Sequence, residues 1–435
     1  YRQREEAHFT ASGMILNPEM DRALMVYHNI YQSISWTGGH ADGETNLLSA
    51  AIGEAKEETG ISTVYPLTGA ILALDILSVK AHEKNGASVP EHEHFSVAYG
   101  LIAPENQGLH IKSDENSLVE WIPLVDLESR CAEPHMIPVY RKLIHRMREL
   151  QAKKERLYGK LPQVLEKWYG ENARALPWRR DREPYHVWLS EIMLQQTRVE
   201  AVKGYYNRFL TAFPTVEALA KGEEGQLMKL WEGLGYYNRA RNLQKAARIV
   251  SEEYGGAFPQ EYEKLLALPG IGVYTGGAIS SICYELPVPA VDGNVIRVIS
   301  RITEDFEESG KQSFKKRMTE RLTEVYRENA AGGGSSGILT QSLMELGAIV
   351  CLPNGEPKCE VCPCGGFCMA RRNGTWEALP QKEKKAARRI EEKTVFVLLR
   401  EEEMVVRRRP PEGLLASLWE LPNEEGVLSE ADALK

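Results

Sequence analysis

The sequence has no long hydrophobic run. None of its segments approaches the roughly 20 consecutive apolar residues that cross a bilayer, and no signal-peptide pattern is present. We therefore predict a cytoplasmic protein with no membrane partner. The chain begins at Tyr1 without a methionine and stops at Lys435 within a strand-like pattern, so we expect truncation at both ends.

Cysteine is scarce outside one short segment. Cys131 and Cys283 stand alone in apolar surroundings, where a small buried thiol is expected, and the other five of the seven cysteines lie between residues 351 and 368. This distribution favours a metal site in a reducing compartment over a disulfide framework. Four thiolates spaced C-x7-C-x2-C-x5-C can bind a 4Fe–4S cluster or a zinc ion, and the spacing does not separate the two.

An excess of positive charge is also missing, since the net charge is −8. The acidity lies in one region, because residues 1–150 have 12 Lys and Arg against 21 Asp and Glu, while the remainder has 41 against 40. A basic groove for nucleic acid on an otherwise neutral body is therefore compatible with the second region.

The chain is longer than one hydrophobic core usually supports, and its texture changes along its length. Strand-like runs and one clear helix at 47–59 come first, followed by amphipathic helices separated by glycine and proline. Residues 332–336 are predicted to form a loop within the helical region. The predicted order is a mixed α/β or α+β domain (1–150), a charged connector (151–160), an all-α domain (155–378), a charged linker (379–393) and a β-rich unit (394–435).

A tight glycine turn precedes a helix at residues 268–275. Gly270 and Gly272 allow backbone N–H groups to approach a phosphate closely, although a simple turn is the alternative. About one helix length later, Asp292 places a carboxylate at the start of another apolar run.

A second carboxylate interrupts the apolar face of a helix at residues 189–198. An acid there is usually paired or functional, and a capping or ion-paired Glu191 is the alternative. Two carboxyl groups in unlike environments can divide the tasks of acid and anion, so we interpret Glu191 and Asp292 together as a catalytic pair.

The turn, the helix and the aspartate resemble the helix-hairpin-helix signature of base-excision DNA glycosylases. Residues 155–378 resemble the MutY family of adenine DNA glycosylases more closely. Strand-cleaving relatives have a lysine where this chain has Tyr274, which favours a purely hydrolytic glycosylase. The matching blocks are 176–179, 191–198, 231–237, 268–275, 291–294 and 344–348.

The resemblance implies removal of adenine mispaired with 8-oxoguanine or guanine in double-stranded DNA, by a monomer working at the bacterial nucleoid. Glu191 would protonate adenine at N7 and Asp292 would stabilise the sugar cation, with Asn294 and Tyr274 beside them. The other implied residues are Trp178, Arg179 and Glu345 around the adenine, Gln196, Thr197, Leu234 and Tyr236 within the duplex, and Gly270 and Gly272 on the DNA backbone. Trp231 is interpreted as a core residue.

The same resemblance implies a 4Fe–4S cluster directly after the helical core. Its ligands would be Cys351, Cys359, Cys362 and Cys368, leaving Cys364 outside the set. The first interval is one residue longer than in the familiar pattern. We expect the cluster to have a structural and DNA-orienting role.

Three glutamates share one face of the predicted helix at 47–59, namely Glu54, Glu57 and Glu58. Such a group repels itself unless cations bind, and oxygen ligands suit Mg²⁺ or Mn²⁺. With residues 38–44 it resembles a Nudix box, which implies a Nudix fold and hydrolysis of free nucleoside diphosphate derivatives. The interval is one residue too long, and Gly53 stands where that family has arginine, so weak activity and a binding-only role are both open.

Two further patterns complete the sequence. His92 and His94 alternate on a predicted strand, and we interpret them as a surface pair rather than as substrate contacts. Residues from Thr394 onward, including 408–422, resemble the start of the Nudix-like C-terminal domain of MutY proteins, here truncated. The alternatives to a glycosylase are a DNA-damage-binding module without chemistry and a Nudix pyrophosphohydrolase tethered to DNA.

Overall fold

The computed structural model describes residues 7–41, 43–79, 81–84, 87–382, 390–410, 412, 415 and 418–433. The chain forms two compact units, residues 1–382 and 383–435. Asp42, residues 383–389 of the predicted charged linker and parts of the 408–422 segment lie outside the described residues. No described helix is long and apolar enough to cross a membrane.

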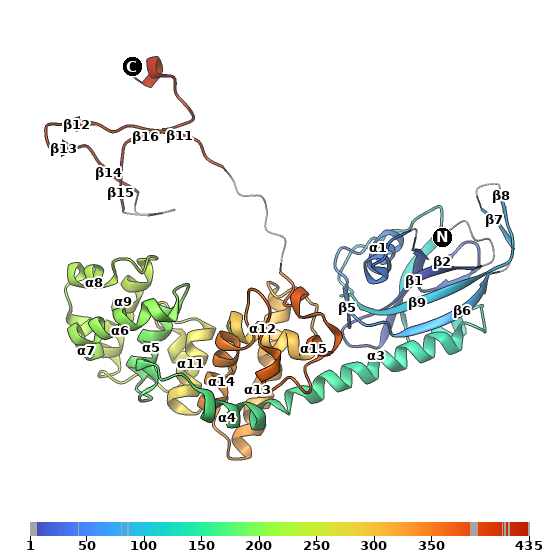
Figure 1. Ribbon diagram of the computed structural model, residues 1–435, viewed down its shortest axis with the longest axis horizontal. Coiled ribbons are helices and arrows are strands. Elements are labelled where there is room, and N and C mark those ends of the chain that lie inside the picture. The colour runs from blue at the N-terminus through green and yellow to red at the C-terminus, as the bar shows by residue number, and fades with distance from the viewer. Residues whose placement is uncertain are drawn as a thin grey trace. The chain divides into compact units, whose positions relative to one another are not determined.

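The first unit begins with an eight-stranded mixed sheet in which β1 and β9 are parallel neighbours (Figure 1). Apolar side chains alternate along β1, so that Ala11 and Ile15 pack with α1 (Leu47–Thr59) while Met14 and Leu16 pack with α3 (Ile137–Tyr158). The sheet consists of β1 (Ala7–Leu16), β2 (Arg22–His28), β3 (Ser33–Ser35), β4 (Thr37–His40), β5 (Tyr65–Pro66), β6 (Ala73–Val79), β9 (His92–Ile102) and β10 (Asn116–Pro123), with the hairpin β7 (His82–Lys84) and β8 (Ala87–Val89) and the short α2 (Leu127–Arg130) beside it.

Helix α3 extends from the sheet into the helical region (Figure 1). Its first half covers the sheet with Leu143 and Met147, and its last turn places Leu157 and Tyr158 in the core of the helices. The predicted connector at 151–160 is therefore wrong for most of its length, because residues 151–158 continue an amphipathic helix whose charged side chains mostly face solvent, while Lys154 is buried.

The helical region has two hydrophobic cores. One is centred on Trp188 and Trp231 and joins α5 to α11, and the other joins α4 and α12 to α15 with the end of α3. The helices are α4 (Leu161–Asn172), α5 (Pro184–Leu194), α6 (Val199–Ala212), α7 (Val216–Lys221), α8 (Glu224–Trp231), α9 (Asn238–Glu253), α10 (Tyr262–Leu266), α11 (Val273–Tyr284), α12 (Gly293–Thr303), α13 (Gln312–Ala331), α14 (Ser336–Ile349) and α15 (Met369–Asn373). Residues 332–335 form the predicted loop between α13 and α14.

A buried carboxylate joins the sheet to the helices. Glu304, which is 0% exposed at the end of α12, accepts hydrogen bonds from Thr68 of the sheet domain and from Asn373 and Thr375 after the cysteine segment. Lys154 of α3 donates to the carbonyls of Leu67 and Glu304. These bonds explain why the two regions form one compact unit.

The second unit is β-rich, as predicted, and consists of short strand pairs. Several of its large apolar side chains are exposed, among them Val397, Leu399 and Trp419. Its elements are β11 (Lys393–Val395), β12 (Leu399–Arg400), β13 (Glu403–Met404), β14 (Arg407–Arg408), β15 (Trp419–Glu420), β16 (Asn423–Glu425) and α16 (Glu430–Ala433).

Candidate active site

A cleft of about 630 Å³ lies between the two helical cores. Its walls come from α5, from the N-termini of α11 and α12, from α14 and from the turn at Pro177–Arg179. Residues more than 150 positions apart in the sequence therefore meet in one concave site. The predicted residues that line it are Trp178, Arg179, Glu191, Gln196, Thr197, Tyr274, Asp292, Asn294 and Glu345.

Glu191 is the buried acid of this cleft and is 6% exposed. The hydroxyl of Tyr274, in the first turn of α11, donates a hydrogen bond to its Oε2 atom. Burial raises the pKa of Glu191 to about 7; the Tyr274 bond opposes this rise, and the nearby Asp292 adds to it. The alternative of a helix-capping or ion-paired glutamate is not what the structure shows, since the described partner of Glu191 is a phenol.

Asp292 occupies the N-cap of α12, where its Oδ1 atom accepts from the backbone N–H of Val295 at 2.8 Å. Its Oδ2 atom accepts from the Asn294 side-chain amide at 2.7 Å. Burial raises the pKa of Asp292, but these two donors and the nearby Arg297 favour its ionised form. The pair thus places an acid that keeps its proton near neutral pH beside a second carboxyl group that is hydrogen-bonded in place.

Arg297 holds Asn294 in position. Its guanidinium donates to the Asn294 side-chain oxygen at 2.9 Å and to the carbonyls of Gly347 and Cys351. The same side chain therefore connects the reacting end of α12 with the first cysteine of the metal segment. Sequence reasoning missed this residue, and its spacing of three residues from Asn294 on the same helix, which places both on one face, is the signal that could have identified it.

Glu345 of α14 is 0% exposed and is enclosed by arginines. Arg174 donates to both of its oxygens, and Arg179 donates to Oε2 at 2.8 Å. Burial opposes ionisation, but these hydrogen bonds hold the pKa of Glu345 at about 2. Sequence reasoning missed Arg174, although a glutamate on an apolar helix face requires a buried counter-charge.

The loops that follow α5 and α8 lie at the cleft and on the surface next to it. Gln196 and Tyr236 both have left-handed backbone, with φ of 60° and 47°, and the Tyr236 side chain is 66% exposed. Arg239 of α9 joins the two loops, because it donates to the carbonyls of Gln195 and Leu234. This arginine was also missed from the sequence.

Leu234 does not lie where the sequence analysis expected it. Its side chain is 6% exposed and packs in the core around Trp231, so it does not project from the surface toward a duplex. The reason is the turn after Trp231, where positive φ at Gly233 and Gly235 directs Leu234 inward and Tyr236 outward. Trp231 is a core residue, as expected.

The predicted hairpin is formed by α10, a turn and α11. Gly270 has a φ of 81°, which favours glycine, and Gly272 caps the N-terminus of α11. An added Cβ at Gly272 would meet no atom within 4 Å, and the side chain of Val273 is exposed. The first N–H groups of α11 are therefore accessible to a phosphate from outside.

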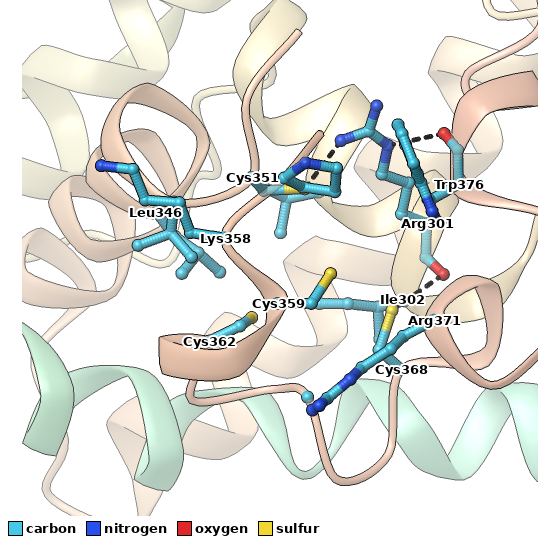
Figure 2. Close-up of a pocket in the computed structure, with 14 residues that line it drawn as sticks. Arg301, Ile302, Leu346, Cys351, Lys358, Cys359, Cys362, Cys368, Arg371 and Trp376 are labelled. Carbon is cyan, nitrogen blue, oxygen red and sulfur yellow. Dashed lines mark hydrogen bonds between the residues drawn. The ribbon is translucent and has the colours of Figure 1, made fainter. Parts of the chain in front are cut away.

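The four predicted cysteine ligands line one cavity beside α12 and α15 (Figure 2). Arg301 donates to the Cys351 sulfur at 3.4 Å, and Cys368 donates to the Arg301 carbonyl. Cys364 is buried and does not line the cavity, in agreement with its exclusion from the ligand set. Within the described residues, no three of the cysteine sulfurs lie within 4.8 Å of one another.

Comparison with known proteins assigns the helical region. Residues 189–324 match the family described as HhH-GPD superfamily base excision DNA repair protein. The helical region belongs to the HhH-GPD superfamily. Its match covers Glu191, the hairpin and Asp292, whereas the cysteine segment lies beyond it.

Curated relatives of this superfamily domain are adenine DNA glycosylases. The one from Buchnera aphidicola subsp. Acyrthosiphon pisum (strain APS) is 38% identical over 224 residues, which is 51% of this chain and 62% of that protein. The one from Homo sapiens is 40% identical over 221 residues, 49% of this chain and 39% of that protein. The chain thus spans less than two thirds of the length of these relatives.

The N-terminal domain, a mixed β-sheet, lies outside the superfamily match. A Nudix-family hydrolase from Clostridium perfringens is similar at 20% identity over 32% of this chain and 96% of its own, with a TM-score of 0.24. This TM-score is too low to establish a shared fold, so the Nudix fold of this domain remains a prediction.

The three glutamates of α1 are not arranged alike. Glu58 is buried and accepts from the backbone N–H of Gly38 at 2.8 Å, Glu54 lies against Gly39, and the exposed Glu57 pairs with Lys112 at 3.7 Å. Burial raises the pKa of Glu58 to about 8. Among the described residues, the three carboxylates do not bring oxygens within 4.8 Å of one another, so the predicted Mg²⁺ or Mn²⁺ site is not closed in this structure.

Proposed function

We propose that this protein is an adenine DNA glycosylase that hydrolyses the N-glycosidic bond of adenine opposite 8-oxoguanine or guanine in double-stranded DNA. The observation that carries the proposal is that Glu191 and Asp292 line one cleft in unlike surroundings, Glu191 buried against a phenol and Asp292 held by a backbone N–H and a side-chain amide. Breaking this bond requires a proton on the departing base and an anion beside the cationic sugar.

Glu191 is suited to the acid role. Its pKa of about 7 means that much of the population carries a proton at neutral pH, ready for adenine N7. Tyr274 holds the carboxyl group from the α11 side and cannot form the Schiff base that strand cleavage requires. The expected reaction is therefore hydrolysis alone, without a break in the strand.

Asp292 is suited to the anion role. The α12 N-cap geometry and the Asn294 amide fix its carboxylate, so it can stabilise positive charge on the sugar and orient the attacking water without rearrangement. Positioning of this kind is effective because the donors are already in place before the charge develops.

The adenine pocket would be formed by Trp178 and Arg179, supported by Glu345. Both Glu345 oxygens are already bound by Arg174 and Arg179, which makes Glu345 a positioning residue for Arg179 and not a direct contact of the base. Extrusion of the adenine from the duplex costs about a few kcal/mol, and a side chain inserted into the base stack helps to offset this cost. Tyr236, with Gln196 and Thr197 beside the cleft, is placed for that insertion, and the hairpin is placed for the DNA backbone.

A 4Fe–4S cluster fits the cysteine cavity better than a zinc ion. Tetrahedral zinc with sulfur ligands at about 2.3 Å requires the sulfurs to lie about 3.8 Å apart, whereas no three of the described cysteine sulfurs lie within 4.8 Å of one another. Cys351, Cys359, Cys362 and Cys368 would hold the cluster, which would order the loop before α15. Arg297 and Arg301 join this loop to α12, so the loop supports the helix that begins at Asp292.

The proposal is tested by single-turnover release of adenine from a duplex with adenine opposite 8-oxoguanine, for the wild type and Asp292→Asn. Asparagine retains the helix N-cap, so the variant is expected to fold. Release that is lost in the variant, with strand breaks only after alkali, supports the proposal. No release by the wild type despite tight binding would indicate a damage-binding module, and strand breaks without alkali would overturn the hydrolytic mechanism.

A further inference from the structure

Four of the ten histidines of the chain lie together on the sheet domain. In the parallel pair of β1 and β9, His8 is directly opposite His94. In the antiparallel pair of β1 and β4, His40 is opposite Thr10, two residues from His8 and therefore on the same face. His92 precedes His94 by two residues and shares that face. The strand register alone brings the four imidazoles together.

The rings of three of these histidines converge closely. The ring centroids of His8 lie 4.5 Å from His40 and 4.8 Å from His94, and those of His40 and His94 lie 5.4 Å apart. One ring nitrogen from each of the three lies within 4.8 Å of the other two, and no other group of metal-ligating side chains in the described part of the chain is so compact. Nitrogens about 2.0–2.1 Å from a tetrahedral metal are about 3.4 Å apart, a separation that small ring rotations would reach.

His92 fixes the tautomer of His94. His92 is buried, so the interpretation of the two as a surface pair is wrong for His92, while His94 is half-buried. Its Nδ1 atom lies 2.9 Å from the Pro90 carbonyl, which can only accept, so Nδ1 of His92 is the donor. In the neutral ring Nε2 of His92 then accepts from Nε2 of His94 at 3.1 Å, which leaves the lone pair of His94 on Nδ1. Hydrogen bonds of this kind hold histidine ligands in metal sites.

The histidine group and the glutamates of α1 lie on opposite faces of the sheet. Gly39, next to His40, faces Glu54 of α1, so the alternation along β4 directs His40 to the opposite face. There it neighbours the buried hydroxyl groups of Thr10 and Ser96. The donors are imidazole nitrogens, which suit zinc and its neighbours in the transition series, whereas carboxylate oxygens suit magnesium.

We propose that His8, His40 and His94 bind one transition-metal dication of the zinc type, with His92 as a positioning residue. Three protein nitrogens leave a fourth coordination position for water or an anionic ligand. The site is independent of the glycosylase cleft and of the predicted Nudix carboxylates.

The test is a calorimetric titration of the chain of residues 1–435, its iron–sulfur cluster retained, with Zn²⁺, combined with X-ray absorption at the zinc edge. We expect one zinc per chain with a shell of light atoms at about 2.0 Å. His40→Gln and His94→Gln should weaken binding at least tenfold, and His92→Gln about tenfold. His145→Gln, at an exposed histidine of α3, is the matched control and should leave the affinity unchanged.

Iron content and the thermal unfolding of each metal-free variant are measured in parallel, and the two ligand variants provide independent tests if one of them folds poorly. Sulfur at about 2.3 Å in the zinc shell would place the metal at the cysteines and overturn the proposal. Equal affinity in the wild type, His40→Gln and His94→Gln would also overturn it. Neither result depends on glycosylase activity.

Discussion

The cleft of the helical region and helix α1 each present three acidic side chains, and the surroundings of the two sets differ. In the cleft, Glu345 is bound by two arginines, Asp292 by a backbone N–H and an amide, and Glu191 by a phenol. On α1, Glu58 has a single backbone donor and Glu57 is exposed. The number of carboxylates in a motif therefore says little about their state, because burial and the donors around each one together set its pKa.

The difference arises from how each set is assembled. The acids of the cleft come from α5, α12 and α14, which close packing holds together: a Cβ added at Gly347 would lie 2.6 Å from the Asn294 side chain. The acids of α1 come from little more than one helical turn, and their contacts with the sheet are to Gly38 and Gly39 of β4. In a site built from several elements the side chains are held in position before the ligand binds. The side chains on one helix face are brought together only when a cation binds.

The largest effect that separates the two sets is expected for Glu191→Gln. The rate of adenine release in single turnover should fall by roughly 10²–10⁴, because the amide cannot supply the proton. The raised pKa of about 7 means that the wild-type rate should decline as pH rises through 7 while that of the variant should not. Rates measured from pH 5 to 9 check both points, and an unchanged rate in the variant would assign the acid to another group.

The same substitution at Glu345 should act on stability. The pKa of Glu345 is lowered from 4.5 to about 2, so its carboxylate stabilises the native state by about 3 kcal/mol above pH 4.5, and this contribution is lost as pH falls toward 2. Glu345→Gln should lower the free energy of unfolding in urea at pH 7 by about that amount. The exposed Glu360→Gln is the control. A difference from the wild type that stays constant between pH 7 and pH 3 would contradict the ionic origin.

Glu58→Gln should raise the free energy of unfolding at pH 7, whereas Glu345→Gln should lower it. The pKa of Glu58 is raised from 4.5 to about 8, so the wild type loses stability as pH rises from 4.5 to 8, by about 3 kcal/mol at pH 7. The amide can still accept from Gly38 but has no proton to lose, so the variant should match the wild type near pH 4 and exceed its stability at pH 7. Urea titrations at the two pH values measure this, and bound Mg²⁺ should narrow the gap because it stabilises the carboxylate.

The sequence identified the helical region and the residues of its cleft through motifs that are local in the chain. Arg174 and Arg239 were missed because each is defined by partners that only the fold brings near, whereas Arg297 also bonds Asn294, which is three residues away in the sequence. The connector at 151–160 was misjudged because charge on one face of a helix resembles charge in a linker. Leu234 was misplaced because the turn geometry at Gly233 and Gly235 decides which side chain points outward, and the histidine group depends on a strand register that no motif encodes.

The smallest effect is expected at Gly53, where the α1 motif departs from the Nudix pattern. An added Cβ there would meet no atom within 4 Å, so Gly53→Ala should raise the free energy of unfolding by about 1 kcal/mol through helix propensity alone. Gly53→Arg should give a similar gain and also place a cation beside the glutamates. Magnesium-dependent hydrolysis of nucleoside diphosphate derivatives is measured for both variants. An increase in Gly53→Arg and not in Gly53→Ala would show that the glutamates of α1 lack only a neighbouring cation that holds them in place. Equal, negligible hydrolysis in both variants would instead indicate that the sheet domain binds without catalysing, and that preassembly by several elements is what distinguishes the cleft.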